Sequence, residues 1–133
     1  MAASMSGLNS NRSPLIRLEA VNKAYKTAAG AFPALKKVTL HVMPAEFLGI
    51  TGKSGAGKTT LVNMITGTDQ ITSGEVWVGD VCVHTMSEDR RARWRGRNIG
   101  VVYQSFHLMP ALSLLENIML PMDFCGRYSA QKS

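Results

Sequence analysis

The sequence predicts a mixed α/β fold, and three observations carry this prediction. An apolar run, a glycine-rich loop and a helical pattern follow one another over residues 47–66. Two strand-like segments, 15–21 and 36–42, precede that unit, and a hairpin signal at 74–83 follows it. The 133 residues suit one domain or a piece of one. With 45% hydrophobic and 18% charged residues, disordered, collagen-like and disulfide-scaffold classes are excluded.

Four segments are predicted to be strands before and after the loop. Residues 36–42 alternate apolar and polar side chains, which is typical of a half-buried strand, and residues 15–21 are also predicted to be a strand. A turn-rich stretch at 27–33 separates these two. Residues 47–51 are more densely apolar and predict a strand buried on both faces, as in a parallel sheet. A further short buried strand is predicted at 98–103.

Helix signals alternate with these strands. A helix is predicted from Gly57 to a stop at Gly67, with apolar residues at Leu61, Val62 and Ile65. Ser113 and Glu116 have the spacing of a capping box at the start of another helix, which Pro121 bends or ends.

A charged helix is predicted over residues 87–95, and the positive charge of the chain is concentrated in and just after it. The chain has 15 Lys+Arg against 9 Asp+Glu, a formal charge of +6. Five arginines fall within eight positions after two acids, an order that the helix dipole favours on a solvated face. The same cluster could meet nucleic acid, anionic lipid or an acidic partner. Its members are Glu88, Asp89, Arg90, Arg91, Arg93, Arg95 and Arg97.

The ends and the cysteines give weaker indications. Residues 1–14 lack the apolar core of a signal peptide and predict a flexible arm, which leaves 15–133 as the folded part. The longest apolar stretches are far shorter than a membrane-spanning helix needs. Cys82 and Cys125 form no metal-binding or redox motif, which favours a reducing compartment.

The glycine-rich loop satisfies the phosphate-binding pattern G-x-x-x-x-G-K-[ST] between a predicted strand and a predicted helix. Its glycines let backbone N–H groups point at phosphate oxygens, and the helix N-terminus adds positive potential. Lys58 would meet the β- and γ-phosphates, Thr59 would offer a hydroxyl to Mg²⁺, and Thr60 could donate to a phosphate. We therefore predict binding of a nucleoside triphosphate with Mg²⁺. The predicted cradle comprises Gly52, Lys53, Ser54, Gly55, Ala56, Gly57, Lys58, Thr59 and Thr60.

Around this loop, the chain resembles the ATP-binding subunits of ABC transporters from about residue 15 to 125. The matching stretches are 21–25 (VNKAY), 34–42 (ALKKVTLHV), 72–76 (TSGEV), 99–104 (IGVVYQ) and 114–121 (LLENIMLP). Their order looks most like the lipoprotein-release, macrolide-exporter and cell-division transporter-like subgroup. The resemblance implies a P-loop NTPase (RecA-like) core with an antiparallel β subdomain, truncated within the helical subdomain.

The resemblance also implies roles for residues outside the loop. Tyr25 matches the aromatic residue that stacks on adenine, although a tyrosine packed at a strand end would look the same. Gln104 matches the glutamine that contacts Mg²⁺ or its water. Residues 106–120 match the segment that faces the membrane subunit, and a core helix remains an equal interpretation.

Departures from the family pattern bear on catalysis. Ala45 stands where the family usually has glycine. The Ser-Gly-Gly-Gln signature, the metal-binding Asp, the catalytic Glu and the switch histidine are absent from the 133 residues. We therefore expect Mg·ATP binding with negligible hydrolysis by this chain alone, together with exposed sheet edges and low stability.

Three hypotheses follow. The first is the N-terminal part of an ABC transporter ATPase subunit, at the cytoplasmic face of the inner membrane, with a transmembrane permease and a second nucleotide-binding subunit as partners and no nucleic acid. The second is a non-hydrolysing nucleotide-binding or interaction piece. The third is a nucleic-acid-binding protein that uses the arginine cluster, with salt-dependent affinity.

Overall fold

The computed structural model describes residues 13–28, 30–105 and 108–125. The chain divides into two compact units, residues 1–86 and 87–133. The first 12 residues of the predicted arm and positions 106–107 of the predicted membrane-facing segment lie outside the described residues. Within the described ranges, no helix is long and apolar enough to cross a membrane.

The first unit is built on an antiparallel sheet in the order β2-β1-β3-β4. Its strands are β1 (Ile16–Thr27), β2 (Gly30–Val42), β3 (Ser73–Val78) and β4 (Val81–Cys82), followed by a short 3-10 helix, η1 (Val83–Thr85). Ile16 lies opposite Val42 on one side and Val78 on the other, so β1 is an interior strand of the sheet. This confirms the predicted strands near 15–21 and 36–42 and the hairpin at Gly79 and Asp80.

The turn between β1 and β2 is tighter than predicted. Pairing continues to Thr27 and resumes at Gly30, so the stretch 27–33 is mostly strand and not loop. The Thr27 hydroxyl donates to the Gly30 carbonyl at 2.6 Å, which closes the turn. The small and turn-forming residues of this stretch are compatible with an exposed hairpin end, and this explains why sequence composition alone suggested a loop.

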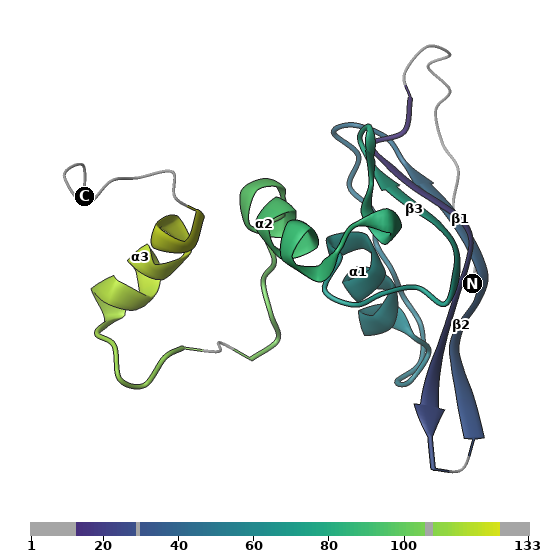
Figure 1. Ribbon diagram of the computed structural model, residues 1–133, viewed down its shortest axis with the longest axis horizontal. Coiled ribbons are helices and arrows are strands. Elements are labelled where there is room, and N and C mark those ends of the chain that lie inside the picture. Colours follow the sequence, from purple (N-terminus) through teal and green to yellow (C-terminus); the bar gives the residue numbers. More distant parts are fainter. Residues whose placement is uncertain (1–12, 29, 106–107, 126–133) are drawn as a thin grey trace. The chain divides into compact units, whose positions relative to one another are not determined.

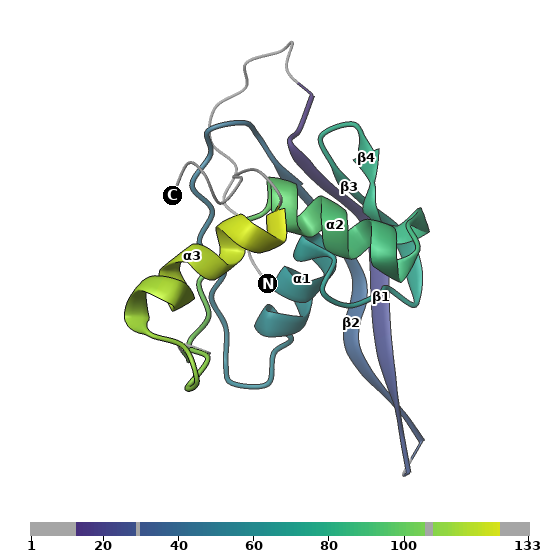
Figure 2. The ribbon, with the colours of Figure 1, turned by 60° about the vertical axis from the view of Figure 1, so that its left-hand side comes forward.

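Helix α1 (Lys58–Thr66) contacts β2 and β3 (Figures 1 and 2). Leu61 and Met64 are 1% exposed and join Leu18, Val21 and Val76 of the sheet in the core, whereas the predicted apolar residue Val62 is 39% exposed. As predicted, the helix ends at Gly67, which has a φ of 67°. The Gly67 and Thr68 N–H groups donate to the Met64 and Asn63 carbonyls, a glycine-terminated cap of the Schellman type.

Two predicted strands do not form. Residues 46–53 and 99–103 have no regular structure, Phe47 is 98% exposed and Val102 is 100% exposed. A strand is stabilised by hydrogen bonds to neighbouring strands, and no strand among the described residues pairs with either segment. The predicted burial of 47–51 on both faces is therefore wrong for this chain.

The second unit contains α2 (Glu88–Asn98) and α3 (Leu114–Cys125). At α3, the Ser113 N–H donates to Glu116 Oε2 at 2.7 Å and the Glu116 N–H donates to the Ser113 hydroxyl at 3.3 Å, which confirms the capping box. Pro121 lies inside the helix and does not end it. Of the α/β fold that the resemblance implied, the described residues thus form the antiparallel subdomain, the loop with α1, and these two helices.

Candidate nucleotide-binding site

Residues 52–57 form a tight loop that leads directly into α1. The Ala56 N–H donates to the Lys53 carbonyl at 3.1 Å, and the Gly57 carbonyl accepts from the Leu61 N–H at 2.8 Å. Gly55 and Gly57 have φ values of 78° and 85°, in the left-handed region that disfavours other residues. The predicted glycine positions therefore have a conformational reason.

Gly57 also has a packing reason. A Cβ atom at this position would lie 2.6 Å from the Ala34 carbonyl oxygen and 3.1 Å from a methyl carbon of Leu35. Both neighbours belong to β2, so the loop reaches α1 only by passing directly against this strand. The loop geometry is therefore coupled to the sheet.

Hydrogen-bond donors converge at the start of α1. The Lys58 ammonium donates to the Gly52 and Lys53 carbonyls at 2.7 and 2.8 Å, so it lies over the loop. The first-turn N–H groups of a helix have no intrahelical partner. Here no side chain caps them, and no acidic residue lies in the first turn. A site with an ammonium, N–H groups and no carboxylate has the chemistry required by a polyphosphate.

The remaining predicted loop residues are accessible. Lys53, Ser54, Ala56 and Thr59 are exposed, whereas Thr60 is half-buried. Thr59 is in the first turn of α1, and its contact with Mg²⁺ stays a prediction.

Tyr25 lies near the end of β1 and is 36% exposed. Its hydroxyl donates to Asp69 Oδ2 at 2.9 Å, and the Lys23 ammonium lies 4.7 Å from the centre of its ring. The tyrosine is therefore anchored to the segment that follows α1. Its stacking on adenine stays a prediction.

Asp69 contacts both Lys23 and Tyr25, and these three residues form a cluster around Asp69. Its Oδ1 accepts from Lys23 Nζ at 2.8 Å and from the Gln70 N–H at 2.6 Å. Partial burial acts to raise the pKa of Asp69, but the hydrogen bonds from Lys23, the Gln70 backbone and Tyr25 outweigh it and lower that pKa below its usual range. Asp69 is therefore ionised at neutral pH.

Gln104 belongs to the second unit, in an exposed segment without regular structure. Its predicted contact with Mg²⁺ stays a prediction.

Helix α2 has the predicted charge order, with Glu88 and Asp89 in its first turn and arginines in its last. Glu88 pairs with Arg91. A shallow surface hollow is lined by Arg90, Arg93, Trp94, Arg97 and Asn98.

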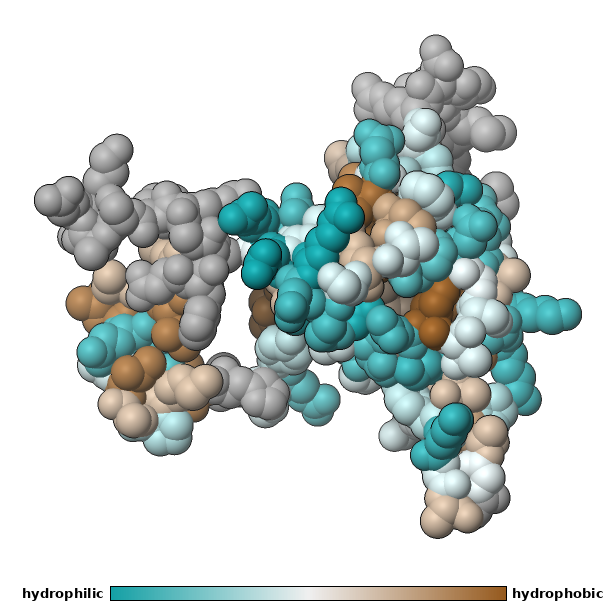
Figure 3. Space-filling model, in the orientation of Figure 1, coloured by the Kyte–Doolittle hydropathy of each residue, from teal (hydrophilic) through white to brown (hydrophobic). Residues whose placement is uncertain are grey.

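Several large apolar residues of α3 and of the segment before it are exposed. Figure 3 shows hydrophobic side chains on the visible surface of α3. Leu115, Ile118 and Met122 are 65%, 60% and 45% exposed and follow helical spacing on one stripe. Within the described residues, these side chains do not form a core helix.

Lys23 and Asp69 were not among the residues predicted from the sequence. Lys23 and Tyr25 are two positions apart on a strand, so they share a face, and that periodicity could have identified the pair. Asp69 carries no such signal, because it is 44 residues from Tyr25 and only the fold brings it near.

Comparison with known proteins is consistent with this site. A family model described as "ABC transporter" matches residues 35–133. The lipoprotein-releasing system ATP-binding protein LolD of Anaeromyxobacter dehalogenans is 42% identical over 109 residues, which are 82% of this chain and 46% of that protein. The macrolide export ATP-binding/permease protein MacB of Syntrophobacter fumaroxidans is 38% identical over 112 residues, which are 84% of this chain and 16% of that protein.

A solved structure gives the same result. The dimeric post-hydrolysis state of the ATP-binding cassette MJ0796, bound to ADP and Pi, superposes with a TM-score of 0.82 at 37% identity and covers 88% of this chain and 51% of that chain. The relative with the same name, an ABC transporter ATP-binding protein of Methanocaldococcus jannaschii, is 39% identical over 110 residues, which are 83% of this chain and 47% of that protein.

The fold and the loop thus define a P-loop nucleotide-binding domain of the α/β class. The chain belongs to the ABC transporter family, in its ATP-binding part. It spans about half of the length of LolD and of the M. jannaschii protein. It spans a smaller share of MacB, whose name describes an ATP-binding/permease protein.

Proposed function

We propose that the chain binds Mg·ATP through residues 52–60. The observation that carries this proposal is the convergence of the Lys58 ammonium and uncapped first-turn N–H groups at an α1 terminus that has no acidic residue. Such a set attracts a polyanion and leaves no carboxylate to repel it.

Around the phosphates, Tyr25 would stack on the adenine ring, and Thr59 and Gln104 would hold Mg²⁺. When bound, Mg²⁺ neutralises charge on the phosphate oxygens. The exposed Thr59 hydroxyl and Gln104 amide are oxygen ligands of the kind that this ion prefers.

At the level of the whole protein, we propose an ATP-binding subunit of an ABC transporter. Its partners would be a transmembrane permease and a second nucleotide-binding subunit, and its place would be the cytoplasmic face of the inner membrane. The names of LolD and MacB, and the dimeric state of the MJ0796 cassette, support this assignment.

For the 133-residue chain alone we propose binding without turnover. Hydrolysis requires a base that orients the attacking water, as well as a carboxylate that holds the metal. The loop and the first turn of α1 contain neither.

Calorimetry with Mg·ATP tests the proposal. Lys58→Ala should abolish saturable binding, because it removes the ammonium that faces the phosphates, whereas Lys36→Ala, an exposed lysine on β2, should leave the Kd unchanged. Equal binding by wild type and Lys58→Ala would contradict the proposed site.

Phosphate release, measured on the same samples, separates the two nucleotide-binding hypotheses. Binding without release supports the non-hydrolysing state of this chain. Release that is lost in Lys58→Ala would show that the chain is itself an ATPase.

A further inference from the structure

The cluster around Asp69 joins two elements of the first unit. Lys23 and Tyr25 project from β1, and Asp69 lies just after the glycine cap of α1. The attachment continues along the chain, since the Thr72 N–H donates to the Asn22 carbonyl at 2.8 Å and the Ala24 N–H donates to the Thr72 hydroxyl at 3.0 Å. The segment 69–72 is therefore held along β1.

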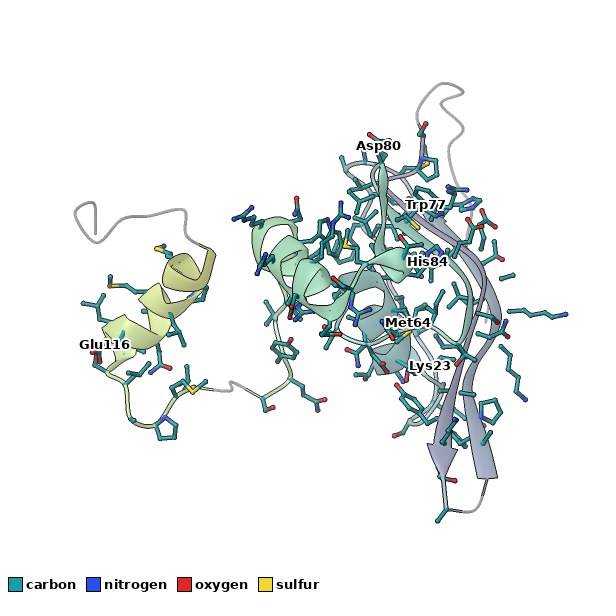
Figure 4. The ribbon with its side chains drawn as sticks, viewed as in Figure 1. Lys23, Met64, Trp77, Asp80, His84 and Glu116 are labelled. Atoms are coloured by element: carbon teal, nitrogen blue, oxygen red, sulfur yellow. The ribbon has the colours of Figure 1, made fainter. Side chains whose placement is uncertain are left out.

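Lys23 is the fixed part of this cluster. Its side chain, labelled in Figure 4, is only 11% exposed. Its ammonium donates both to Asp69 Oδ1 at 2.8 Å and to the Gln70 carbonyl at 2.6 Å. The same ammonium lies over the Tyr25 ring. Such a cation–π contact is electrostatically favourable, and it is stronger when the cation is desolvated.

We propose that Asp69 and Lys23 are positioning residues that fix the orientation of the Tyr25 ring and thereby set the affinity of the site for a nucleotide base. The inference rests on the proposed function, because it requires Tyr25 to contact the base. It adds two residues that themselves touch neither the base nor the phosphates.

The physical argument concerns the cost of ordering a side chain. Asp69 holds the tyrosine hydroxyl with Oδ2, and Lys23 occupies one face of the ring, so a base can stack on the opposite face. A ring that is already ordered does not lose rotational freedom when the base binds, so this entropic cost is avoided.

The arrangement also makes the effect selective. Asp69 follows the C-terminal end of α1, whereas the phosphate loop precedes its N-terminal end. Substitution at Asp69 therefore leaves the phosphate donors unchanged. It should weaken binding of a ligand with a base and not of one without.

The test compares Mg·ATP with magnesium tripolyphosphate, which has no base, by calorimetry on the full chain. Tyr25→Phe removes only the hydroxyl, Asp69→Ala removes the acceptor, and Lys23→Met removes the ammonium while keeping an apolar stem. Each should raise the Kd for ATP about 3- to 10-fold. The Kd for tripolyphosphate should change by less than about two-fold, since the phosphate donors remain.

Asp80→Ala is the matched control, because Asp80 is an exposed acid in the turn between β3 and β4 (Figure 4). It should change neither Kd. Circular dichroism at the same temperature checks that every variant is folded. If Asp69→Ala does not fold, Tyr25→Phe still tests the inference.

Equal losses for ATP and tripolyphosphate would overturn the inference, because Asp69 and Lys23 would then act only on stability. An unchanged ATP affinity in Tyr25→Phe would also overturn it. If wild type binds ATP no more tightly than tripolyphosphate, the inference fails and the phosphate site stands. If it binds neither ligand, the proposed function fails, and the positioning role fails with it.

Discussion

At the scale of single residues, the positions with a left-handed backbone conformation determine which side chains the sheet can accommodate. Ala20 has a φ of 47° at an irregularity in β1, and its N–H donates to the Thr39 hydroxyl at 3.1 Å. Gly74 in β3 faces this irregularity with a φ of 97°. A Cβ atom on Gly74 would lie 2.6 Å from the Ala20 carbonyl and 2.7 Å from the Glu19 carbonyl. Only glycine fits there.

We predict that Gly74→Ala lowers the free energy of unfolding by about 2 to 4 kcal/mol, because the left-handed conformation and the overpacking both cost energy. Urea unfolding followed by circular dichroism measures this. Gly49→Ala is the control, since a Cβ at Gly49 meets nothing within 4 Å, and it should change stability by about 0.5 kcal/mol or less. Equal midpoints for the two variants would contradict the prediction.

Ala45 illustrates the opposite case. It has a φ of 63° in the turn between Met43 and Glu46, where the Glu46 N–H donates to the Met43 carbonyl at 3.2 Å. With Pro44 before it, this is the position at which such turns favour glycine. The alanine is accommodated in a conformation that glycine would adopt at lower cost.

At the scale of elements, the outcome of sequence prediction depended on where the stabilising partners lie. Contacts between residues a few positions apart stabilise helix α1, the capping box of α3 and the β3–β4 hairpin. These elements were predicted correctly. The strands at 47–51 and 98–103 need partner strands from elsewhere, and none among the described residues supplies them. Apolar density showed that these segments favour burial, but it could not provide a partner.

The candidate site divides along the same line. The loop 52–60 was predictable because its chemistry depends on a contiguous motif. Two long-range features could not be predicted: the close approach of Gly57 to the Ala34 carbonyl and the Lys23–Asp69 ion pair. The first joins residues that are 23 positions apart in the sequence, and the second joins residues that are 46 positions apart. Such contacts follow from the path of the chain and not from local pattern.

The ion pair between β1 and the segment after α1 predicts a pH dependence. Because the folded-state pKa of Asp69 lies below its usual range, its stabilising contribution is complete above the unfolded pKa near 4 and is lost as the pH falls through the folded pKa. Asp69→Asn should therefore cost about 1 to 2 kcal/mol near pH 7 and progressively less below about pH 4.

Urea unfolding of wild type and Asp69→Asn between pH 7 and pH 3 measures this difference. Asp80→Asn, in the exposed turn between β3 and β4, controls for the loss of a carboxylate and should have a small effect throughout. A difference for Asp69→Asn that grows on acidification would have the wrong sign and would refute the role of the ion pair.

At the scale of the whole molecule, apolar exposure is the main feature of both units. Phe47 in the first unit and Val102 in the second are almost fully exposed, and the stripe on α3 adds Leu115, Ile118 and Met122. Burying such a side chain contributes about 1.5 to 3 kcal/mol. Association with other protein surfaces is therefore strongly favoured.

We predict that the chain self-associates in a concentration-dependent manner, and that Leu115→Glu with Ile118→Glu shifts it toward monomer. Sedimentation velocity at several loading concentrations measures the distribution. Ala111→Glu, an exposed position before α3, adds charge without removing a large apolar side chain and should have less effect. A monomeric wild type at all concentrations would disprove this prediction.

The passage of Gly57 against β2 has a thermodynamic consequence for the whole first unit. The loop keeps its shape while the strand beside it is folded, so ligand binding at the loop and folding of the sheet are thermodynamically coupled. A ligand at 100 times its Kd would raise the free energy of unfolding by about 2.7 kcal/mol. By the same linkage, ligand binding at the loop should slow amide hydrogen exchange along β2.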